Sequence, residues 1–288
     1  MSQDRLEASL DIDRLPSIDI VRIIQDEDAS VAAAVAAERG KIAHAVDEIA
    51  ERLAHGGHLF YAGAGTSGRI AALDAAELPP TFGVDPSLVR VLMAGGERAF
   101  LHAVEGAEDD EDAAIDAVNE NVKAEDAVVG VAASGTTPYT VAAVRRANML
   151  GALTVGVTSV AASPLAREVD IAIVPQTGPE VIMGSSRMKS GTAQKLILNS
   201  ISTAVMIRLG HVYSNLMIDM PATNDKLRDR AVRMVELAAG VLRPTAVQAL
   251  RDADGNVKLA AIIAKKRISA DEARALLEKQ SLREVLEA

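Results

Sequence analysis

Two short loops in the sequence combine glycines with side-chain hydroxyl groups. The first covers residues 63–68 and includes Thr66, Ser67 and Gly68. The second covers residues 133–138 and includes Ser134, Gly135, Thr136 and Thr137. Glycine lets the backbone approach an anion closely, and the N–H groups at the start of a following helix can bind that anion. The loops therefore predict a phosphate-bearing ligand, and the alternative is that the hydroxyls only cap their helices.

The first loop also matches Gly-x-Gly-x-x-Gly, the pattern of a dinucleotide-binding loop. That pattern expects an acidic residue about 20 positions later, at the end of the next strand. Here the next apolar run ends in Met-Ala-Gly-Gly-Glu, about 30 residues after Gly68. A dinucleotide also requires no second hydroxyl loop. We therefore favour a sugar phosphate, with one loop for the phosphate and the other for the sugar hydroxyls.

Carboxylates near the loops could transfer protons. Glu77 stands just before Pro79-Pro80, where we expect the helix over residues 67–78 to stop. The negative end of the helix dipole would favour a protonated carboxyl group there, as a general acid requires, although a solvated glutamate is the alternative. A second cluster comprises Glu105, Glu108, Asp109, Asp110, Glu111 and Asp112. Acids commonly gather at helix N-termini, so spacing alone selects none of these as a base.

A third polar segment, residues 184–191, precedes a long helix predicted for residues 188–212. It supplies Ser185, Ser186, Arg187 and Lys189. These side chains could close over an anionic group, to which arginine donates paired hydrogen bonds, or they could cap the helix. The five histidines lack the spacing of a metal motif such as His-Glu-x-x-His. We expect neither a metal nor an organic cofactor.

The loops need a scaffold that brings them to one edge. Five apolar runs predict buried strands with helices between them, at residues 58–65, 88–96, 126–135, 153–159 and 170–178. This alternation predicts an α/β fold with a parallel sheet flanked by helices, in which ligands bind beyond the carboxyl ends of the strands. We expect an N-terminal arm over residues 1–18, the sheet domain over 19–240, and a small domain of three helices over 241–288.

Composition limits the possible partners. The net charge is −10, aromatic residues make up 2% of the chain, and tryptophan and cysteine are absent. Nucleic-acid binding usually needs basic patches or aromatic stacking platforms, so we expect none. Without cysteine there are no disulfides or thiolate sites, which fits a reducing compartment. The polar N-terminus resembles no targeting peptide, and no apolar run approaches the roughly 20 residues of a membrane span. We expect a cytoplasmic protein.

Several stretches carry a resemblance to a known family. They are GAGTSGR, DAAELPPTFG, HAVEGAEDD, AASGTTPY, GPEVIMGSSRMKSGTAQKLILN and NLMIDMPATNDKL. The two loops resemble the SIS (sugar isomerase) domain, a phosphosugar-binding fold with a five-stranded parallel sheet. All the stretches together resemble the N-acetylmuramic acid 6-phosphate etherase family over roughly residues 17–285. The run GSSRMKSGTAQK is more specific than either loop, and the last third resembles the UBA-like three-helix domain that ends this family.

The resemblance implies a lyase. Its reaction would remove D-lactate from C3 of N-acetylmuramic acid 6-phosphate and then add water, giving N-acetylglucosamine 6-phosphate. Glu77 would be the acid that protonates the lactyl oxygen. Glu108, which follows Gly-Ala, would be the base at C2, with Glu105 in reserve. Two alternatives are a non-catalytic sugar-phosphate sensor, like the related glucokinase regulatory protein, and an aldose–ketose sugar phosphate isomerase. A sensor needs neither glutamate, and an isomerase needs no acid at C3.

The spacing of Ser67 and Glu77 bears on assembly. Ten residues span about 15 Å along a helix, which exceeds the distance between the phosphate and C3 of a hexose phosphate. Either the second loop holds the phosphate, or Glu77 serves the site of a neighbouring subunit. We expect a homodimer with shared sites.

Overall fold

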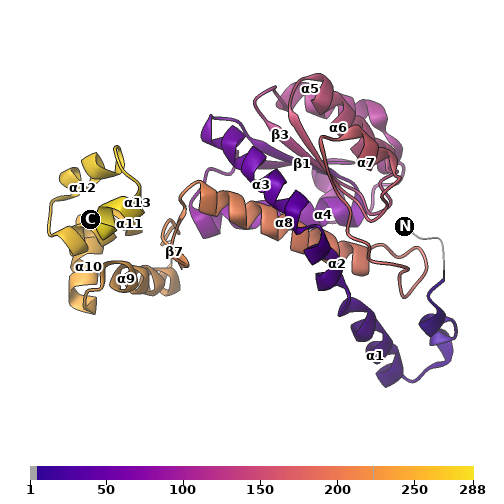
Figure 1. Cartoon of the computed structure of the whole chain (residues 1–288), viewed down its shortest axis with the longest axis horizontal. Helices are drawn as coiled ribbons and strands as arrows, with labels where there is room; N and C mark the ends of the chain where they lie inside the picture. Colours follow the sequence, from indigo (N-terminus) through magenta and orange to yellow (C-terminus); the bar gives the residue numbers. More distant parts are fainter. Residues whose placement is uncertain (1–4, 223) are drawn as a thin grey trace. The chain divides into compact units, whose positions relative to one another are not determined.

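The computed structural model describes residues 5–222 and 224–288 (Figure 1). The chain forms two compact units. The first comprises residues 1–76 and 87–205, and the second comprises residues 77–86 and 206–288. Within the described residues, no helix is long and apolar enough to cross a membrane.

The first unit is built on a five-stranded parallel sheet, as the sequence predicts. The strands are β1 (Leu59–Gly63), β2 (Val89–Met93), β3 (Ala127–Val131), β4 (Leu153–Val157) and β5 (Ile171–Ile173), in the order β2-β1-β3-β4-β5. In the register, Gly63 lies beside Met93 and Val131, so these strands end at the same level. β1, β3 and β4 are buried along their whole length because helices cover both faces of a parallel sheet.

Helices cover the sheet on both sides (Figure 1). α5 (Glu111–Asn121), α6 (Pro138–Met149) and α7 (Pro164–Glu168) share one apolar core with β1 and β3. α3 (Arg39–Ala54) packs against β4 and β5. α4 (Gly65–Phe82) and α8 (Lys189–Arg208) are joined through buried Asp74, which accepts hydrogen bonds from Tyr61, Asn199 and Ser202. This buried network fixes α4 on β1 and thereby fixes the first glycine loop.

The N-terminal segment is more ordered than the arm expected from the sequence. Two short 3₁₀ turns, at Glu7–Ser9 and Ile12–Arg14, precede α1 (Ser17–Asp28) and α2 (Val31–Ala37). The structure also contains α7, which is not predicted from the sequence because its five residues are too few for a periodic apolar pattern.

α4 corrects the expected helix end. Helical structure begins at Gly65 and continues through Pro79 and Pro80 to Phe82, so Glu77 does not lie in the last turn. Each proline lacks an N–H group and removes one helical hydrogen bond. Leu78 and Phe82 are nevertheless buried. Their burial favours continuation of the helix over the stop that the two prolines alone would predict.

The second unit is helical apart from a two-stranded hairpin, β6 (Val212–Tyr213) and β7 (Leu216–Met217). α9 (Asp225–Ala239) shares an apolar core with α10 (Arg243–Asp252), α11 (Val257–Lys266), α12 (Ala270–Leu277) and α13 (Leu282–Glu287). The expected three helices correspond to α10–α12, and α13 follows them. One capping box joins Ser269 and Glu272, and a second one joins Ser281 and Glu284. The domain boundary at residue 240 stays a prediction.

Candidate active site

A cavity of about 530 Å³ lies where β1 and β3 end and α4 and α6 begin. It joins the two glycine loops to two of the clustered acids, Glu108 and Asp109, and to the segment before α8. Its lining residues are Ala64, Gly65, Thr66, Ser67, Glu108, Asp109, Ala133, Ser134, Thr136, Thr137, Pro138, Gly184 and Ser186. The structure therefore brings together residues that lie up to 122 positions apart, from Ala64 to Ser186.

The first loop places hydroxyls in the opening turn of α4. Gly65 has a φ of +54°, and Thr66 and Ser67 follow it at the cavity wall. Gly68 does not line the cavity. A Cβ at Gly68 would lie 2.3 Å from Met93 Sδ and 2.8 Å from the carbonyl oxygen of Gly63. Gly68 therefore allows close packing of α4 on β1, which aims the N-terminus of this helix at the cavity.

The second loop is fixed by a hydroxyl network and by its neighbours. Thr136 N–H donates to Ser134 Oγ at 3.2 Å, and the two hydroxyls lie 2.9 Å apart. Thr137 is the N-cap residue of α6, but its side chain makes no capping hydrogen bond. The interpretation of Thr137 as a side-chain cap is therefore wrong, and its hydroxyl remains available at the cavity wall. Ser67 likewise lies inside the first turn of α4 rather than before it.

Gly135 sets the shape of this loop. Its φ is +66°, and a Cβ there would lie 2.3 Å from Ser163 Oγ and 2.6 Å from Thr158 Oγ1. Gly135→Ala combines a strained backbone with these clashes, so we expect it to lower the free energy of unfolding by about 1–3 kcal/mol. Thermal unfolding of the variant and of the wild type would measure this loss. Gly240→Ala is the control, because its φ of +68° gives the same backbone strain while no atom lies within 4 Å of its added Cβ.

Glu108 and Asp109 are the carboxylates that the fold places beside the hydroxyls. Both lie in a 3₁₀ turn, Ala107–Asp109, which follows Gly106 in the left-handed conformation. Asp110, next along the chain, accepts a hydrogen bond from Ala113 N–H and caps α5. Within the acidic cluster, Asp110 thus caps α5, whereas Glu108 and Asp109 line the cavity with exposed side chains.

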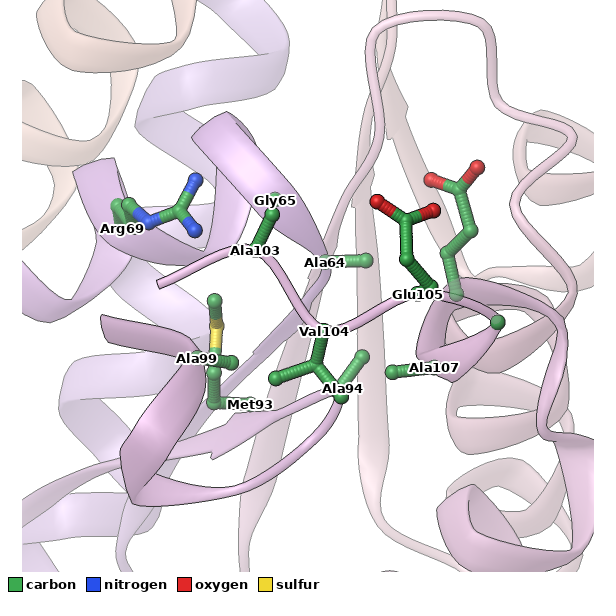
Figure 2. A pocket seen from close by; sticks show the side chains of 12 residues that line it. Ala64, Gly65, Arg69, Met93, Ala94, Ala99, Ala103, Val104, Glu105 and Ala107 are labelled. Carbon is green, nitrogen blue, oxygen red and sulfur yellow. The ribbon is translucent and has the colours of Figure 1, made fainter. Parts of the chain in front are cut away.

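A smaller cavity of about 200 Å³ adjoins the first and shares Ala64, Gly65 and Glu108 with it. Figure 2 shows Glu105 on one side of it and Arg69 on the other. Arg69 donates hydrogen bonds to the carbonyl oxygens of Phe100 and His102, so it holds the chain that encloses this cavity. Glu105 does not line the first cavity, called the larger cavity below, and geometry therefore favours Glu108 over Glu105 as the group that faces the space between the loops.

Tyr139 is an additional ionisable group near the acidic segment. Burial raises its pKa to about 12, and the negative charge of Asp110 adds to the shift. The phenol therefore stays protonated at neutral pH, so it cannot act as the base.

Glu77 lies on the part of α4 that belongs to the second unit, and its side chain is exposed. Beyond it, Gly83 ends this stretch against the chain at Asp219, since a Cβ there would lie 2.2 Å from the carbonyl oxygen of Asp219. Asp219 also accepts a hydrogen bond from His211 and forms an ion pair with Lys258, and both of these residues follow α8 in the sequence. The second unit therefore supports the end of the helix that carries Glu77.

The segment before α8 contributes one of its predicted side chains to the cavity. Ser186 lines it, whereas Ser185, Arg187 and Lys189 are not among the lining residues that the structure describes. Lys189 is buried and donates to Glu27. Glu180, which the sequence analysis did not select, is buried and accepts hydrogen bonds from the N–H groups of Lys189 and Ser190. It therefore occupies the N-terminus of α8.

The larger cavity offers hydrogen-bond donors to an anion, but its described lining includes no positively charged side chain. Two helix N-termini and several hydroxyls face it, and both kinds of group donate hydrogen bonds to phosphate. Among its described lining residues none is lysine or arginine. Within the part of the chain that the structure describes, no group of three or more His, Asp or Glu side chains is arranged to hold a metal ion.

Comparisons with known proteins agree with this fold. The model of the glucokinase regulatory protein N-terminal SIS domain matches residues 41–148, and the SIS domain model matches residues 102–204. A phosphoheptose isomerase from Francisella tularensis has a similar fold, with a TM-score of 0.55 and 20% identity, covering 67% of this chain and 100% of that one. The Vibrio vulnificus NanR protein complexed with ManNAc-6P gives a TM-score of 0.50 at 16% identity, covering 82% and 74%.

Curated relatives match almost the whole chain. An N-acetylmuramic acid 6-phosphate etherase of Symbiobacterium thermophilum is 54% identical over 91% of this chain and 87% of its own length. One of Clostridium beijerinckii is 50% identical over 96% and 92%. Identity at this level over nearly the full length of both chains places this protein in one family with them. The chain belongs to the N-acetylmuramic acid 6-phosphate etherase family.

Proposed function

We propose that this protein is a lyase that cleaves the D-lactyl ether of N-acetylmuramic acid 6-phosphate. The products are D-lactate and N-acetylglucosamine 6-phosphate. The observation that carries the proposal is the larger cavity, in which the hydroxyls of both glycine loops and the carboxylate of Glu108 face the same space. Family membership supports the same reaction.

The hydroxyl-lined part of the cavity would bind the substrate. Two helix N-termini and the side chains of Thr66, Ser67, Ser134, Thr136 and Thr137 would hold the phosphate and the sugar hydroxyls. Ser186 would complete the wall, and Gly68 and Gly135 would shape the loops. Ser185, Arg187 and Lys189 lie outside the lining of this cavity, so a direct contact from them is not part of the proposal.

The reaction would proceed by elimination and then hydration. In the open-chain sugar the C1 aldehyde acidifies the C2 proton, which Glu108 would remove. The C2 electron pair forms the C2–C3 double bond as the C3–O bond breaks, and Glu77 would protonate the departing lactate oxygen. Water then adds at C3 and a proton returns to C2. A base and an acid with separate positions meet both needs without a metal.

Assembly is part of this proposal. Glu77 lies ten residues after Ser67 on one helix, about 15 Å along its axis. We therefore propose a homodimer in which Glu77 of one subunit serves the cavity of the other. We also place the reaction in the cytoplasm, because a charged sugar phosphate crosses a lipid bilayer only at a large desolvation cost.

Two other activities make different demands. An aldose–ketose isomerase would use Glu108 at C2 but would leave Glu77 without a task. A sensor of sugar phosphates would need the hydroxyl cavity and neither glutamate. An N-acetylmuramic acid 6-phosphate etherase uses all three features, and this is why we favour it.

The test is incubation of the purified protein with N-acetylmuramic acid 6-phosphate in H₂¹⁸O, followed by mass spectrometry. We expect unlabelled lactate and one ¹⁸O at C3 of the sugar product, after label from aldehyde exchange is subtracted. Label in lactate would contradict cleavage of the C3–O bond. Binding of the substrate without release of lactate would favour the sensor.

A further inference from the structure

The chain between β5 and α8 reaches the larger cavity without regular structure of its own. Residues 174–188 form only turns, bends and irregular backbone, yet Gly184 and Ser186 line the cavity. A loop of this length needs contacts from elsewhere to keep one conformation. We call residues 174–189 the cavity segment.

Three side chains from the N-terminal part of the chain bind the cavity segment near its start, its middle and its end. In that order, Val174 N–H donates to Glu38 Oε2 at 3.1 Å, Ser9 Oγ donates to the carbonyl oxygen of Val181 at 2.7 Å, and Lys189 Nζ donates to Glu27 Oε2 at 2.5 Å. Each contact joins residues more than 130 positions apart. We call Ser9, Glu27 and Glu38 the N-terminal clamp.

Of these contacts, the ion pair of Glu27 and Lys189 should be the most costly to lose, because the charged group of Lys189 is buried. The Lys189 side chain is 2% exposed and that of Glu27 is 25% exposed. A buried ammonium group needs a partner, because removal from water costs several kcal/mol. The backbone N–H of Lys189 is held by Glu180, so this residue is fixed through both its main chain and its side chain. Ser186 stands three residues before this fixed point.

α1, which carries Glu27, has few apolar contacts to hold it. None of its residues is buried, and Ile18 and Val21 are exposed. Polar contacts therefore contribute a large part of what fixes α1 against the cavity segment. Loss of the Glu27 carboxylate would leave the ammonium group of Lys189 buried without its partner, which favours a rearrangement of the segment.

We propose that the N-terminal clamp positions the wall of the active-site cavity, and that Glu27 is a positioning residue that acts on Ser186 through Lys189. Its effect on catalysis rests on the function proposed above. Its effect on the conformation of the cavity segment does not. The competing interpretation is that Lys189 binds the substrate phosphate directly, in which case Glu27 is only its resting partner.

The first test compares Glu27→Gln with the wild type and with Asp19→Asn. Asp19 is the matched control, since it lies on the same helix and pairs only locally with Arg22 in the contacts described. We expect faster hydrogen–deuterium exchange in peptides covering residues 181–188 for Glu27→Gln and unchanged exchange for Asp19→Asn. This readout needs no substrate. Unchanged exchange in Glu27→Gln would overturn the proposal, whatever the wild type does with N-acetylmuramic acid 6-phosphate.

The second readout is kinetic. We expect Glu27→Gln to raise KM, and the dissociation constant of N-acetylglucosamine 6-phosphate, about ten- to a hundredfold, because a displaced wall loses contacts to the bound sugar. The value of kcat should change less, since neither proposed proton-transfer group moves. A thermal melt of each variant reports whether it is folded at the assay temperature.

A double variant separates positioning from direct binding. Glu27→Gln with Lys189→Met removes both charges and leaves a residue of similar length, and neutral replacement of a buried ion pair is often tolerated. If the clamp positions the wall, the double variant should recover most of the lost affinity and exchange protection. If Lys189 binds phosphate, the double variant should bind as weakly as Lys189→Met alone, and this result would refute the proposal.

Discussion

Replacing Glu108 by glutamine is expected to slow lactate release by about 10²–10⁴-fold, the usual contribution of a general base. Glutamine keeps the shape of the side chain and cannot accept the C2 proton. Affinity for N-acetylglucosamine 6-phosphate should change little, because the hydroxyls of both loops remain in place. Exchange of the C2 proton with D₂O in recovered substrate should stop. Mass spectrometry of the substrate and an assay of lactate would measure these effects together.

Glu105→Gln is the control that the structure supplies for this experiment. Glu105 lies three residues earlier in the same acidic segment and lines the smaller cavity with Glu108, but it does not line the larger one. We expect it to retain activity within about tenfold of the wild type, which is well below the effect of removing a base. A greater loss in Glu105→Gln than in Glu108→Gln would reverse the assignment of the base.

Replacing Glu77 by glutamine is expected to slow lactate release by a similar factor, but with a different signature. Without the acid, the lactyl oxygen must leave as an unprotonated alkoxide, so the C3–O bond breaks slowly. Glu108 remains able to remove the C2 proton. Deuterium from D₂O should therefore still enter C2 of recovered substrate. Loss of both exchange and lactate release in folded Glu77→Gln would contradict the role of acid.

Mixing the two inactive variants tests whether the site is shared between subunits. In a hybrid dimer with a shared site, one cavity receives both replacements and the other receives none. Random exchange makes half of the dimers hybrids, so about a quarter of wild-type activity should return. If each subunit carries its own complete site, every site in the mixture lacks one glutamate and no activity returns. That result, or a fully active monomer in light scattering, would refute the shared site.

The parallel sheet could be predicted because its signals are local. Each of the five strands is a short apolar run that a helical pattern follows or precedes, and the two glycine loops occur where strands end. The end of α4 could not be predicted, because Pro79 and Pro80 indicate a stop whereas the burial of Leu78 and Phe82 favours continuation of the helix. That burial depends on the folded chain, so no short window of sequence contains it.

The polar residues also divide into those that local sequence predicts and those whose role depends on distant parts of the chain. The loops with Ser67 and Ser134 could be selected from glycine and hydroxyl spacing, and both line the larger cavity. Lys189 was expected to close over an anionic group or to lie at a capped helix start. It is instead buried and paired with Glu27, which lies 162 residues away in sequence. The role of Glu180 could not be predicted for a similar reason. Its two backbone donors are nine and ten residues ahead, across a turn.

The composition of the larger cavity has a consequence for the response to ionic strength. Most sites that bind phosphate through lysine and arginine lose affinity as salt screens the attraction. Here hydroxyls and helix N-termini supply the donors, Glu108 and Asp109 are the charged residues of the wall, and the chain carries a net charge of −10. Protein and ligand therefore repel each other at long range. Added salt weakens this repulsion, so the substrate should associate faster, not more slowly, as ionic strength rises.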